Sequence, residues 1–191
     1  MPIATKLELR AAAKRQLRNF STIEQEFRGI LQERRTYTEV TIFLSHCHAD
    51  RDQIEPVVVF LRRLGIHVYV DWMDETMPRT TSGTTAAKIK RKIKQNHKFI
   101  FLATNRAIIS RWCNWELGLG DAAKYIQNIC LFPLADSSSD WKGNEYLSVY
   151  PRIEKKRTFY ATQSYQPFRT EDWEVIYPDG SRMSLQAWLR R

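Results

Sequence analysis

The side chains best suited to chemistry lie in one short segment, residues 110–118 (SRWCNWELG). The segment follows an apolar run, residues 99–103, that has the length and composition of a buried strand. Ser110 is a suitable N-cap, and in a helix that begins near residue 111, Trp112 and Glu116 share one face. Judged by residue types alone, a glutamate favoured by the helix dipole beside core tryptophans is the plainer interpretation.

Polar residues also directly follow each of the strands that the sequence predicts before this segment. The predicted strands at residues 40–44, 66–70 and 99–103 are followed by Ser45, His46, Asp71, Trp72, Thr104 and Asn105. Because the carboxyl ends of parallel strands meet at one edge of a sheet, we expect these side chains to converge with Trp112 and Glu116 on a single cleft. This convergence favours a functional site over a purely structural role for Glu116.

Several other kinds of site have weaker support. No GxGxxG follows the first strand and no GxxxxGK[ST] occurs anywhere, so neither a dinucleotide-binding Rossmann site nor a P-loop is predicted. His46 and His48, with Cys47 between them, have no further cluster of ligands, and we expect no metal site. A phospho-accepting receiver domain would use Asp71 with Asp50 and Asp52, but it lacks a strand-end lysine and leaves residues 112–116 unexplained.

Strands and helices alternate between residues 37 and 135, which predicts an α/β fold with a parallel sheet and helices on both faces. Residues 1–36 are predicted to be a basic helical extension, with eight Lys or Arg and four Glu up to residue 35, that docks on its own domain or on a sister subunit. The main domain would span residues 37–165. Residues 166–191 would form a C-terminal extension, a possible strand, turn and helix. The pattern of strands and helices is weaker after residue 135, where we expect a short helix at residues 144–150 and a fifth strand at residues 157–162.

The formal net charge of the 191-residue chain is +9, which favours polyanionic partners such as nucleic acid, acidic membrane or phosphate-bearing small molecules. Basic residues gather at positions 88–98, where a solvated helix face is a simpler interpretation than a nucleic-acid site. Three cysteines without a CxxC pattern indicate a reducing compartment. With neither a secretory signal nor a membrane span in the sequence, we expect a cytoplasmic protein.

Three segments resemble the conserved boxes of Toll/interleukin-1 receptor (TIR) domains, particularly the bacterial ones. These segments are residues 41–46 with Asp50, residues 64–71 and residues 110–117, and the match covers roughly residues 38–135 in the correct order. The resemblance implies a flavodoxin-like fold. It also implies that residues 73–84 are the family's BB loop, a lid or contact loop in which Pro78-Arg79-Thr80 replaces the Pro-Gly of adaptor members.

The enzymes of this family cleave the nicotinamide–ribose bond of NAD, and the resemblance makes Glu116 the catalytic residue and Trp112 the first residue of the W-x-x-x-E motif. Nicotinamide leaves as a neutral base, so one ionised carboxylate suffices to stabilise the oxocarbenium-like charge. We expect Glu116, near a helix N-terminus, to be ionised. The predicted substrate-binding residues are Ser45, His46, Asp71, Trp72, Trp112 and Cys113.

Four of these residues have a proposed part in binding. Trp72 or Trp112 would stack on adenine or nicotinamide, while Ser45 and His46 would hold a phosphate or a ribose hydroxyl. Cys113 is expected to pack beside the substrate and not to act as a nucleophile, because no His lies near it in sequence. Capture of the ribosyl cation by water would give ADP-ribose, and capture by a group of the same molecule would give a cyclic isomer. The sequence does not decide between the two products. NAD is a substrate in this scheme, and no cofactor is expected.

The resemblance also implies a biological setting. A TIR domain without a receptor segment resembles the Thoeris-type bacterial enzymes that make an NAD-derived signal in defence against phage. It implies a homo-oligomer built by TIR–TIR contacts and a separate effector protein that responds to the product. The alternative is a catalytically silent TIR module that works by homotypic assembly, because fold alone does not determine activity.

Overall fold

The computed structural model describes residues 3–15, 17, 22–32, 40–74, 82–156 and 172–191. The strands are β1 (Ala4–Thr5), β2 (Val40–Ser45), β3 (Ile66–Tyr69), β4 (Lys98–Ala103), β5 (Ile129–Ala135), β6 (Arg152–Lys155), β7 (Trp173–Ile176) and β8 (Arg182–Ser184). The α-helices are α1 (Lys6–Arg15), α2 (Ile23–Gln32), α3 (Arg51–Arg62), α4 (Gly83–Gln95), α5 (Asn105–Ile109), α6 (Arg111–Ala123) and α7 (Leu185–Arg190). Short 3-10 turns lie at residues 48–50, 71–73, 126–128 and 145–149.

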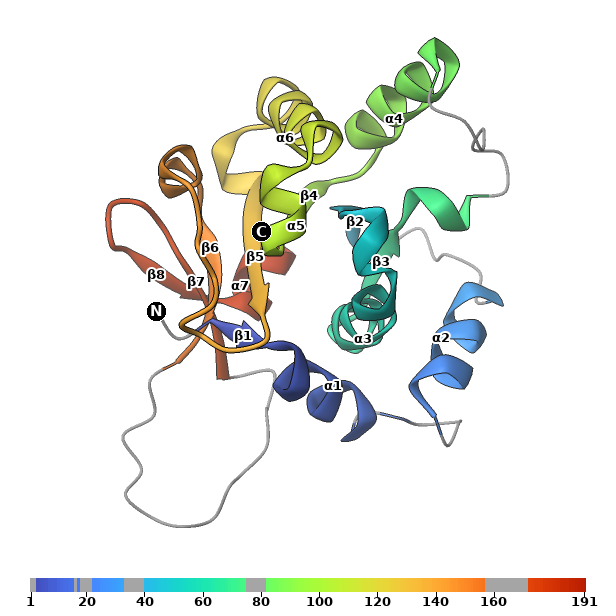
Figure 1. The fold of residues 1–191 in the computed structure, drawn as a ribbon, viewed down its shortest axis with the longest axis vertical. Coiled ribbons are helices and arrows are strands. Elements are labelled where there is room, and N and C mark those ends of the chain that lie inside the picture. Colours follow the sequence, from blue (N-terminus) through green and yellow to red (C-terminus); the bar gives the residue numbers. More distant parts are fainter. Residues whose placement is uncertain (1–2, 16, 18–21, 33–39, 75–81, 157–171) are drawn as a thin grey trace.

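The strands form one mixed sheet in the order β3-β2-β4-β5-β6-β7-β8 (Figure 1). The pairs from β3 to β6 are parallel, whereas β6–β7 and β7–β8 are antiparallel. The chain runs from β2 outward to β3 and then crosses back to β4, so the direction of strand addition reverses between β2 and β4. In open α/β sheets, ligand sites form at the carboxyl ends of the strands beside such a reversal. The predicted α/β fold with a central parallel sheet is confirmed.

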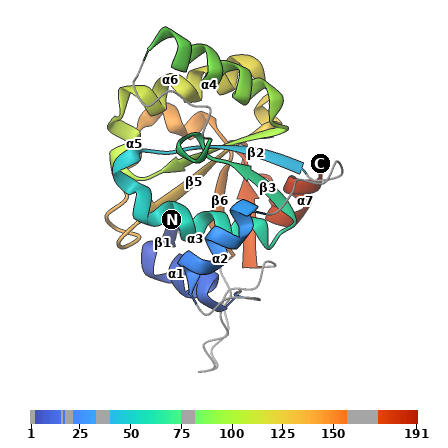
Figure 2. The same cartoon turned by 90° about the vertical axis from the view of Figure 1, so that its right-hand side faces the viewer.

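Helices cover both faces of the sheet (Figure 2). One face carries α4, α5 and α6 over a core that includes Phe43, Phe99 and Phe101. The other face carries α1, α2, α3 and α7 over a core that includes Phe60, Phe132 and Trp173. The central strands are buried on both faces, which explains why they are apolar throughout instead of alternating. No helix in the described part of the chain is long and apolar enough to cross a membrane.

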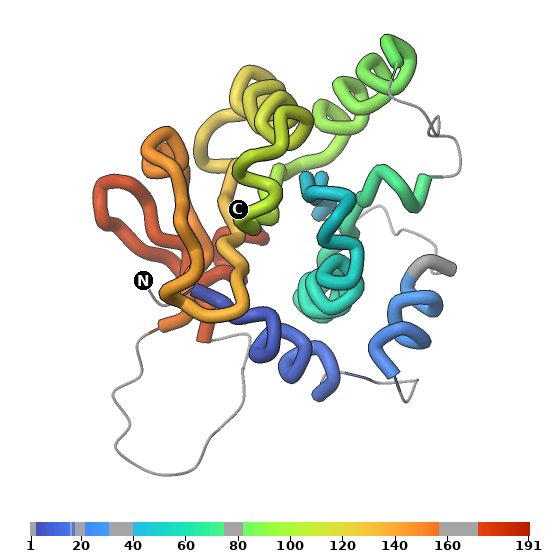
Figure 3. Tube along the Cα trace, in the orientation of Figure 1, coloured from blue at the N-terminus to red at the C-terminus, as the bar shows by residue number. Residues whose placement is uncertain are grey.

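The N-terminal segment is built into the domain, as the docking interpretation predicted. Helices α1 and α2 lie along α3 (Figure 3), and Leu9 and Phe27 enter the core beneath the sheet. The prediction of a wholly helical segment was wrong at its start, because Ala4 and Thr5 pair in parallel with Leu134 and Ala135 of β5. A two-residue strand is too short to produce a period in the sequence, so only the tertiary pairing reveals it.

The C-terminal segment extends the sheet more than the sequence indicated. The turn at residues 145–149 agrees with the predicted short helix, and β7 followed by α7 agrees with the predicted strand and helix. The antiparallel strand β8 was not predicted, and β6 at Arg152–Lys155 precedes the fifth strand that we expected. The predicted strand at residues 157–162 lies outside the described residues.

Gly120 marks a tight contact between α6 and the sheet. A Cβ atom at this position would lie 3.0 Å from ring atoms of Phe99, whereas a Cβ at Gly118 in the same helix would meet no atom within 4 Å. We expect Gly120→Ala to destabilise the protein by about 1–3 kcal/mol through overpacking. Gly118→Ala should instead stabilise it by up to about 1 kcal/mol through helix propensity. Urea unfolding of both variants tests this contrast, and equal shifts of the two midpoints would contradict it.

Candidate active site

Helix α6 brings Glu116 to the end of strand β2. The helix begins as predicted, because Ser110 Oγ accepts a hydrogen bond of 3.3 Å from the backbone N–H of Cys113. Glu116 is the sixth residue of the helix and its side chain is buried, with 3% of the residue exposed. Ser45, the last residue of β2, donates a hydrogen bond of 2.6 Å from Oγ to Glu116 Oε2. Two predicted site residues separated by 71 positions are therefore in direct contact.

The charge state of Glu116 differs from the prediction. Burial is the largest cause and raises the pKa of its carboxyl to about 8. Hydrogen bonds from Ser45 and Trp112 lower this pKa, whereas the Asp71 carboxylate raises it further. The carboxyl is therefore mostly protonated at neutral pH, and our expectation of an ionised side chain was wrong for the unliganded site. The helix dipole acts within the first turn, and Glu116 lies in the second.

His46 and Asp71 form a second buried contact at the same edge of the sheet. His46 Nδ1 lies 3.1 Å from the carbonyl oxygen of Leu44, which can only accept, so Nδ1 carries the proton. His46 Nε2 faces Asp71 Oδ1 at 3.6 Å, and neither atom has a hydrogen-bond partner among the described residues. Burial lowers the pKa of His46, and the Asp71 carboxylate only partly opposes the shift. Neutral His46 thus points an acceptor lone pair at another acceptor.

The other two predicted residues on α6 differ in their surroundings. Trp112 is half-buried, and its ring centroid lies 4.7 Å from that of Trp115 at a tilt of 30°. Cys113 is 1% exposed and packs in the core between α6 and the sheet. Burial raises the pKa of its thiol to about 12, so the group is neutral and unreactive, as expected of a packed residue. Cys113 is thus a packing residue of the core next to the site.

The structure does not bring Trp72 to this cluster. Its indole packs on the opposite face of the sheet, where the Arg51 guanidinium lies 4.1 Å from the ring centroid and Phe27 lies 6.1 Å away. It lines a cavity of about 660 Å³ between α2 and α3. Asp71 and Trp72 lie in the 3-10 turn that follows β3, where successive side chains point about 120° apart, so Trp72 faces away from Asp71. Of the two tryptophans proposed for stacking, only Trp112 lies beside Glu116.

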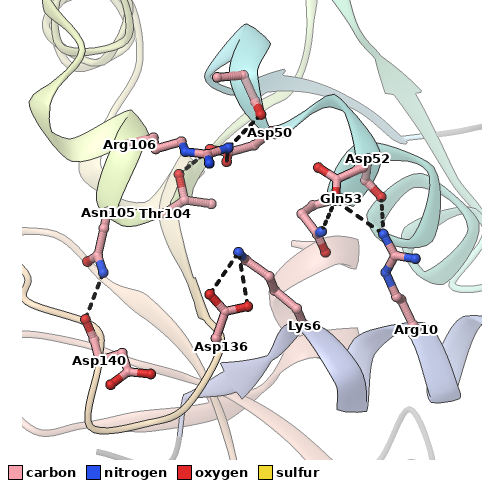
Figure 4. Close-up of polar contacts among 11 residues, drawn as sticks. Lys6, Arg10, Asp50, Asp52, Gln53, Thr104, Asn105, Arg106, Asp136 and Asp140 are labelled. Atoms are coloured by element: carbon pink, nitrogen blue, oxygen red, sulfur yellow. Dashed lines mark hydrogen bonds and ion pairs between the residues drawn. The ribbon is translucent and has the colours of Figure 1, made fainter.

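A polar network that the sequence did not predict joins the ends of β2 and β4, where the order of strand addition reverses (Figure 4). Thr104 donates to the buried carboxylate of Asp50, and it also caps α5 by accepting from the N–H of Ala107. Arg106 donates to the carbonyl oxygen of Ala49 at 2.8 Å and pairs with Asp50 Oδ1 at 3.3 Å. This network holds the loop that follows His46. The signals available in the sequence were Asp50, in the loop after β2, and Arg106, just after β4.

Asn105 takes no part in that network, since its side-chain amide donates to the carbonyl oxygen of Asp140 at 2.7 Å. Asp52 pairs with Arg10 instead of joining Asp50 and Asp71 (Figure 4). The described residues hold no group of three or more His, Cys, Asp or Glu that could bind a metal ion. The acidic cluster that a receiver domain requires is accordingly not found in the described part of the chain.

The predicted lid falls mostly outside the described residues, which omit positions 75–81. Its first residues are held in place, because Asp74 accepts a hydrogen bond of 2.9 Å from the Tyr69 hydroxyl and pairs with Lys92 at 2.8 Å. Lys92 comes from the basic helix α4, whose outer face exposes Lys90, Arg91 and Lys94. The basic run is a solvated helix face for the most part, as the simpler interpretation predicted.

Comparison with known proteins places these residues in a family. The family model for the TIR domain matches residues 42–163. The chain is 36% identical over 126 residues to a Bacillus cereus (strain MSX-D12) protein named "Probable 3' cyclic ADP-D-ribose synthase ThsB'", and the match covers 64% of each chain. It is 23% identical over 116 residues to the "Putative cyclic ADP-D-ribose synthase TIR2" of Cytobacillus dafuensis, covering 52% of this chain and 31% of that one. The chain thus spans less than two thirds of the length of either relative.

Proposed function

Since the chain belongs to the TIR domain family, we propose that it cleaves the nicotinamide–ribose bond of NAD and converts the rest of the molecule to a cyclic ADP-ribose. The observation that carries the proposal is the Ser45–Glu116 contact, which places the glutamate of the W-x-x-x-E segment at the carboxyl end of the first central strand. The names of the two relatives support a cyclic product, and the name of the Bacillus cereus protein makes the 3' isomer the first candidate.

Glu116 would act by stabilising positive charge. Departure of nicotinamide leaves an oxocarbenium-like centre on the ribose, and an ionised carboxylate in a water-poor site stabilises such charge far more strongly than in water. The carboxyl of the unliganded site is mostly protonated, because burial raises its pKa to about 8. The nicotinamide ring of bound NAD is itself a cation and favours the carboxylate form. Substrate binding would therefore ionise the group that the reaction needs.

Access to the site requires an opening motion. Ser45, His46, Asp71 and Glu116 are all at least 92% buried in the unliganded protein, so NAD reaches the carboxyl only after the surrounding segments move apart. We propose that homotypic assembly between TIR domains favours the open form, and that the cyclic product acts on a separate effector protein in antiviral defence. Both proposals rest on family membership, and the first predicts that activity rises with protein concentration.

The test is direct. NAD is incubated with concentrated protein, and the mixture is separated by chromatography with mass detection. Release of nicotinamide together with a product that has the mass and retention time of a cyclic ADP-ribose would support the proposal, and linear ADP-ribose alone would restrict it to hydrolysis. Intact NAD at every protein concentration, with crowding agents included, would contradict it and favour the silent interaction module.

Ser45 should tune this reaction without being essential to it. Its hydroxyl donates to Glu116 and lowers the pKa of the carboxyl. Ser45→Ala removes this donor, so the carboxylate form becomes less stable and NAD cleavage should slow by about tenfold at neutral pH, the cost of a charged hydrogen bond of about 1.5 kcal/mol. Raising the pH should restore part of the loss, because more of the carboxyl is then ionised. A rate deficit that does not depend on pH would contradict this role.

A further inference from the structure

The His46–Asp71 contact has an excess of hydrogen-bond acceptors. Nδ1 of His46 donates its proton to the Leu44 carbonyl, so Nε2 offers only a lone pair, and the atom that it faces is a carboxylate oxygen of Asp71, which is an acceptor. The two atoms lie 3.6 Å apart, and the part of the chain that the structure describes offers neither of them a hydrogen-bond partner. A buried acceptor without a donor destabilises the folded protein, because it has lost its hydrogen bonds to water. A ligand hydroxyl group would supply the missing donor.

The pair lies next to the proposed reaction centre. His46 directly follows Ser45, whose hydroxyl contacts Glu116. The Asp71 carboxylate acts electrostatically on both His46 and Glu116, since it opposes the fall in the pKa of the first and adds to the rise in that of the second. Because His46 adjoins Ser45 in the chain and Asp71 influences both His46 and Glu116, the two pairs belong to one site at this edge of the sheet.

We propose that His46 Nε2 is the general base that accepts the proton of the hydroxyl group that captures the ribosyl cation, with Asp71 stabilising the imidazolium that forms. This inference rests on the proposed function. In the first step, the C–N bond to nicotinamide breaks and its electron pair leaves with nicotinamide. In the second step, the hydroxyl oxygen forms a bond to the anomeric carbon and its proton moves to Nε2, from which it is later lost to solvent. The hydroxyl belongs to the second ribose for a cyclic product and to water for a linear one.

The arrangement is that of a base and its orienting group. The Leu44 carbonyl fixes the tautomer by holding the Nδ1 proton, which leaves the lone pair on the nitrogen that faces Asp71. A general base of this kind contributes about 10²–10⁴-fold to the step that it serves. Glu116 serves the first step and His46 the second, so substitutions at the two positions should affect different steps.

A pyridine nitrogen separates the two steps, because it attacks the ribosyl cation without having a proton to lose. Exchange of isotope-labelled nicotinamide into NAD therefore needs bond cleavage but no general base. His46→Gln keeps an acceptor oxygen that can bind a hydroxyl group but cannot take its proton. We expect this variant to exchange label at a rate within about threefold of wild type and to lose about a hundredfold in formation of hydroxyl-captured product.

Controls and outcomes distinguish the inference from the function on which it rests. His48→Gln changes an exposed neighbour whose ring centroid lies 5.8 Å from that of His46 and should affect neither rate. Glu116→Gln should lose both, and thermal melting reports whether each variant is folded. The role of His46 would be overturned if folded His46→Gln lost both the exchange rate and the rate of product formation, or if it lost neither. It would also be overturned if the wild type consumed NAD without exchanging label. A wild type that neither consumes NAD nor exchanges label would overturn the proposed function as well.

Discussion

Glu116→Gln is expected to lower the rate of NAD cleavage by about a hundred- to a thousandfold. The substitution keeps the shape of the side chain and leaves an amide oxygen that can accept the Ser45 hydrogen bond. It removes the only negative charge that this side chain can place beside the developing ribosyl cation. A neutral amide dipole stabilises such a cation much less than a carboxylate does in a buried site, where the dielectric response is weak.

The measurement is nicotinamide release under single-turnover conditions, with protein in excess over NAD. Glu174→Gln is a matched control, because Glu174 is a buried carboxylate of β7 that pairs with Arg182 at 2.6 Å, outside the site. The control should cleave NAD at nearly the wild-type rate, even if it is less stable. A Glu116→Gln protein that cleaves NAD as fast as wild type would exclude Glu116 as the charge-stabilising group.

The central fold follows from the sequence because its strands are apolar on both faces. Residues 99–103 and 129–134 have no polar position, and a run of this length between polar helices has few alternatives to a doubly covered parallel strand. The elements that escaped prediction are short or depend on partners distant in sequence. Strand β1 has two residues and is defined only by its pairing with β5. Strand β8 is largely polar and exists because β7 offers an antiparallel edge.

The members of the site were easier to predict than their environment. Ser45, His46 and Asp71 were predicted from strand ends in a parallel sheet and Glu116 from the helix that follows the next strand, and the structure joins these residues in two pairs, Ser45 with Glu116 and His46 with Asp71. The ionisation of Glu116 does not follow in this way, because the pKa of a carboxyl depends on burial, and burial is a property of the assembled fold. The direction of Trp72 likewise does not follow from the sequence, because it depends on the 3-10 turn after β3, which is too short to produce a period.

Glu116 should also make the stability of the fold depend on pH. Its carboxyl has a pKa of about 8 in the folded protein, against an ordinary value of 4.5 that the unfolded chain would approach. Between these values the folded state holds a proton that the unfolded state has lost, so the free energy of unfolding falls as pH rises. The contribution is fully present below about pH 4.5 and is lost as pH rises through about 8. Each unit of difference is worth about 1.4 kcal/mol, which gives a total of roughly 5 kcal/mol, of which about 4 kcal/mol is lost between pH 5 and pH 9.

Glu116→Gln isolates this contribution, because the amide does not titrate and all other groups are shared with wild type. The two proteins should have similar free energies of unfolding near pH 5, where the wild-type carboxyl is protonated. Near pH 9 the variant should be more stable by roughly 4 kcal/mol, since wild type then buries a charge. Urea unfolding at both pH values measures the difference. A gap that stays constant, or one in which wild type gains stability toward high pH, would show that the folded protein does not hold the proton. If the predicted gap is found, the same residue limits stability at the pH where its ionised form supports catalysis, as expected of a functional group that is held in a buried site.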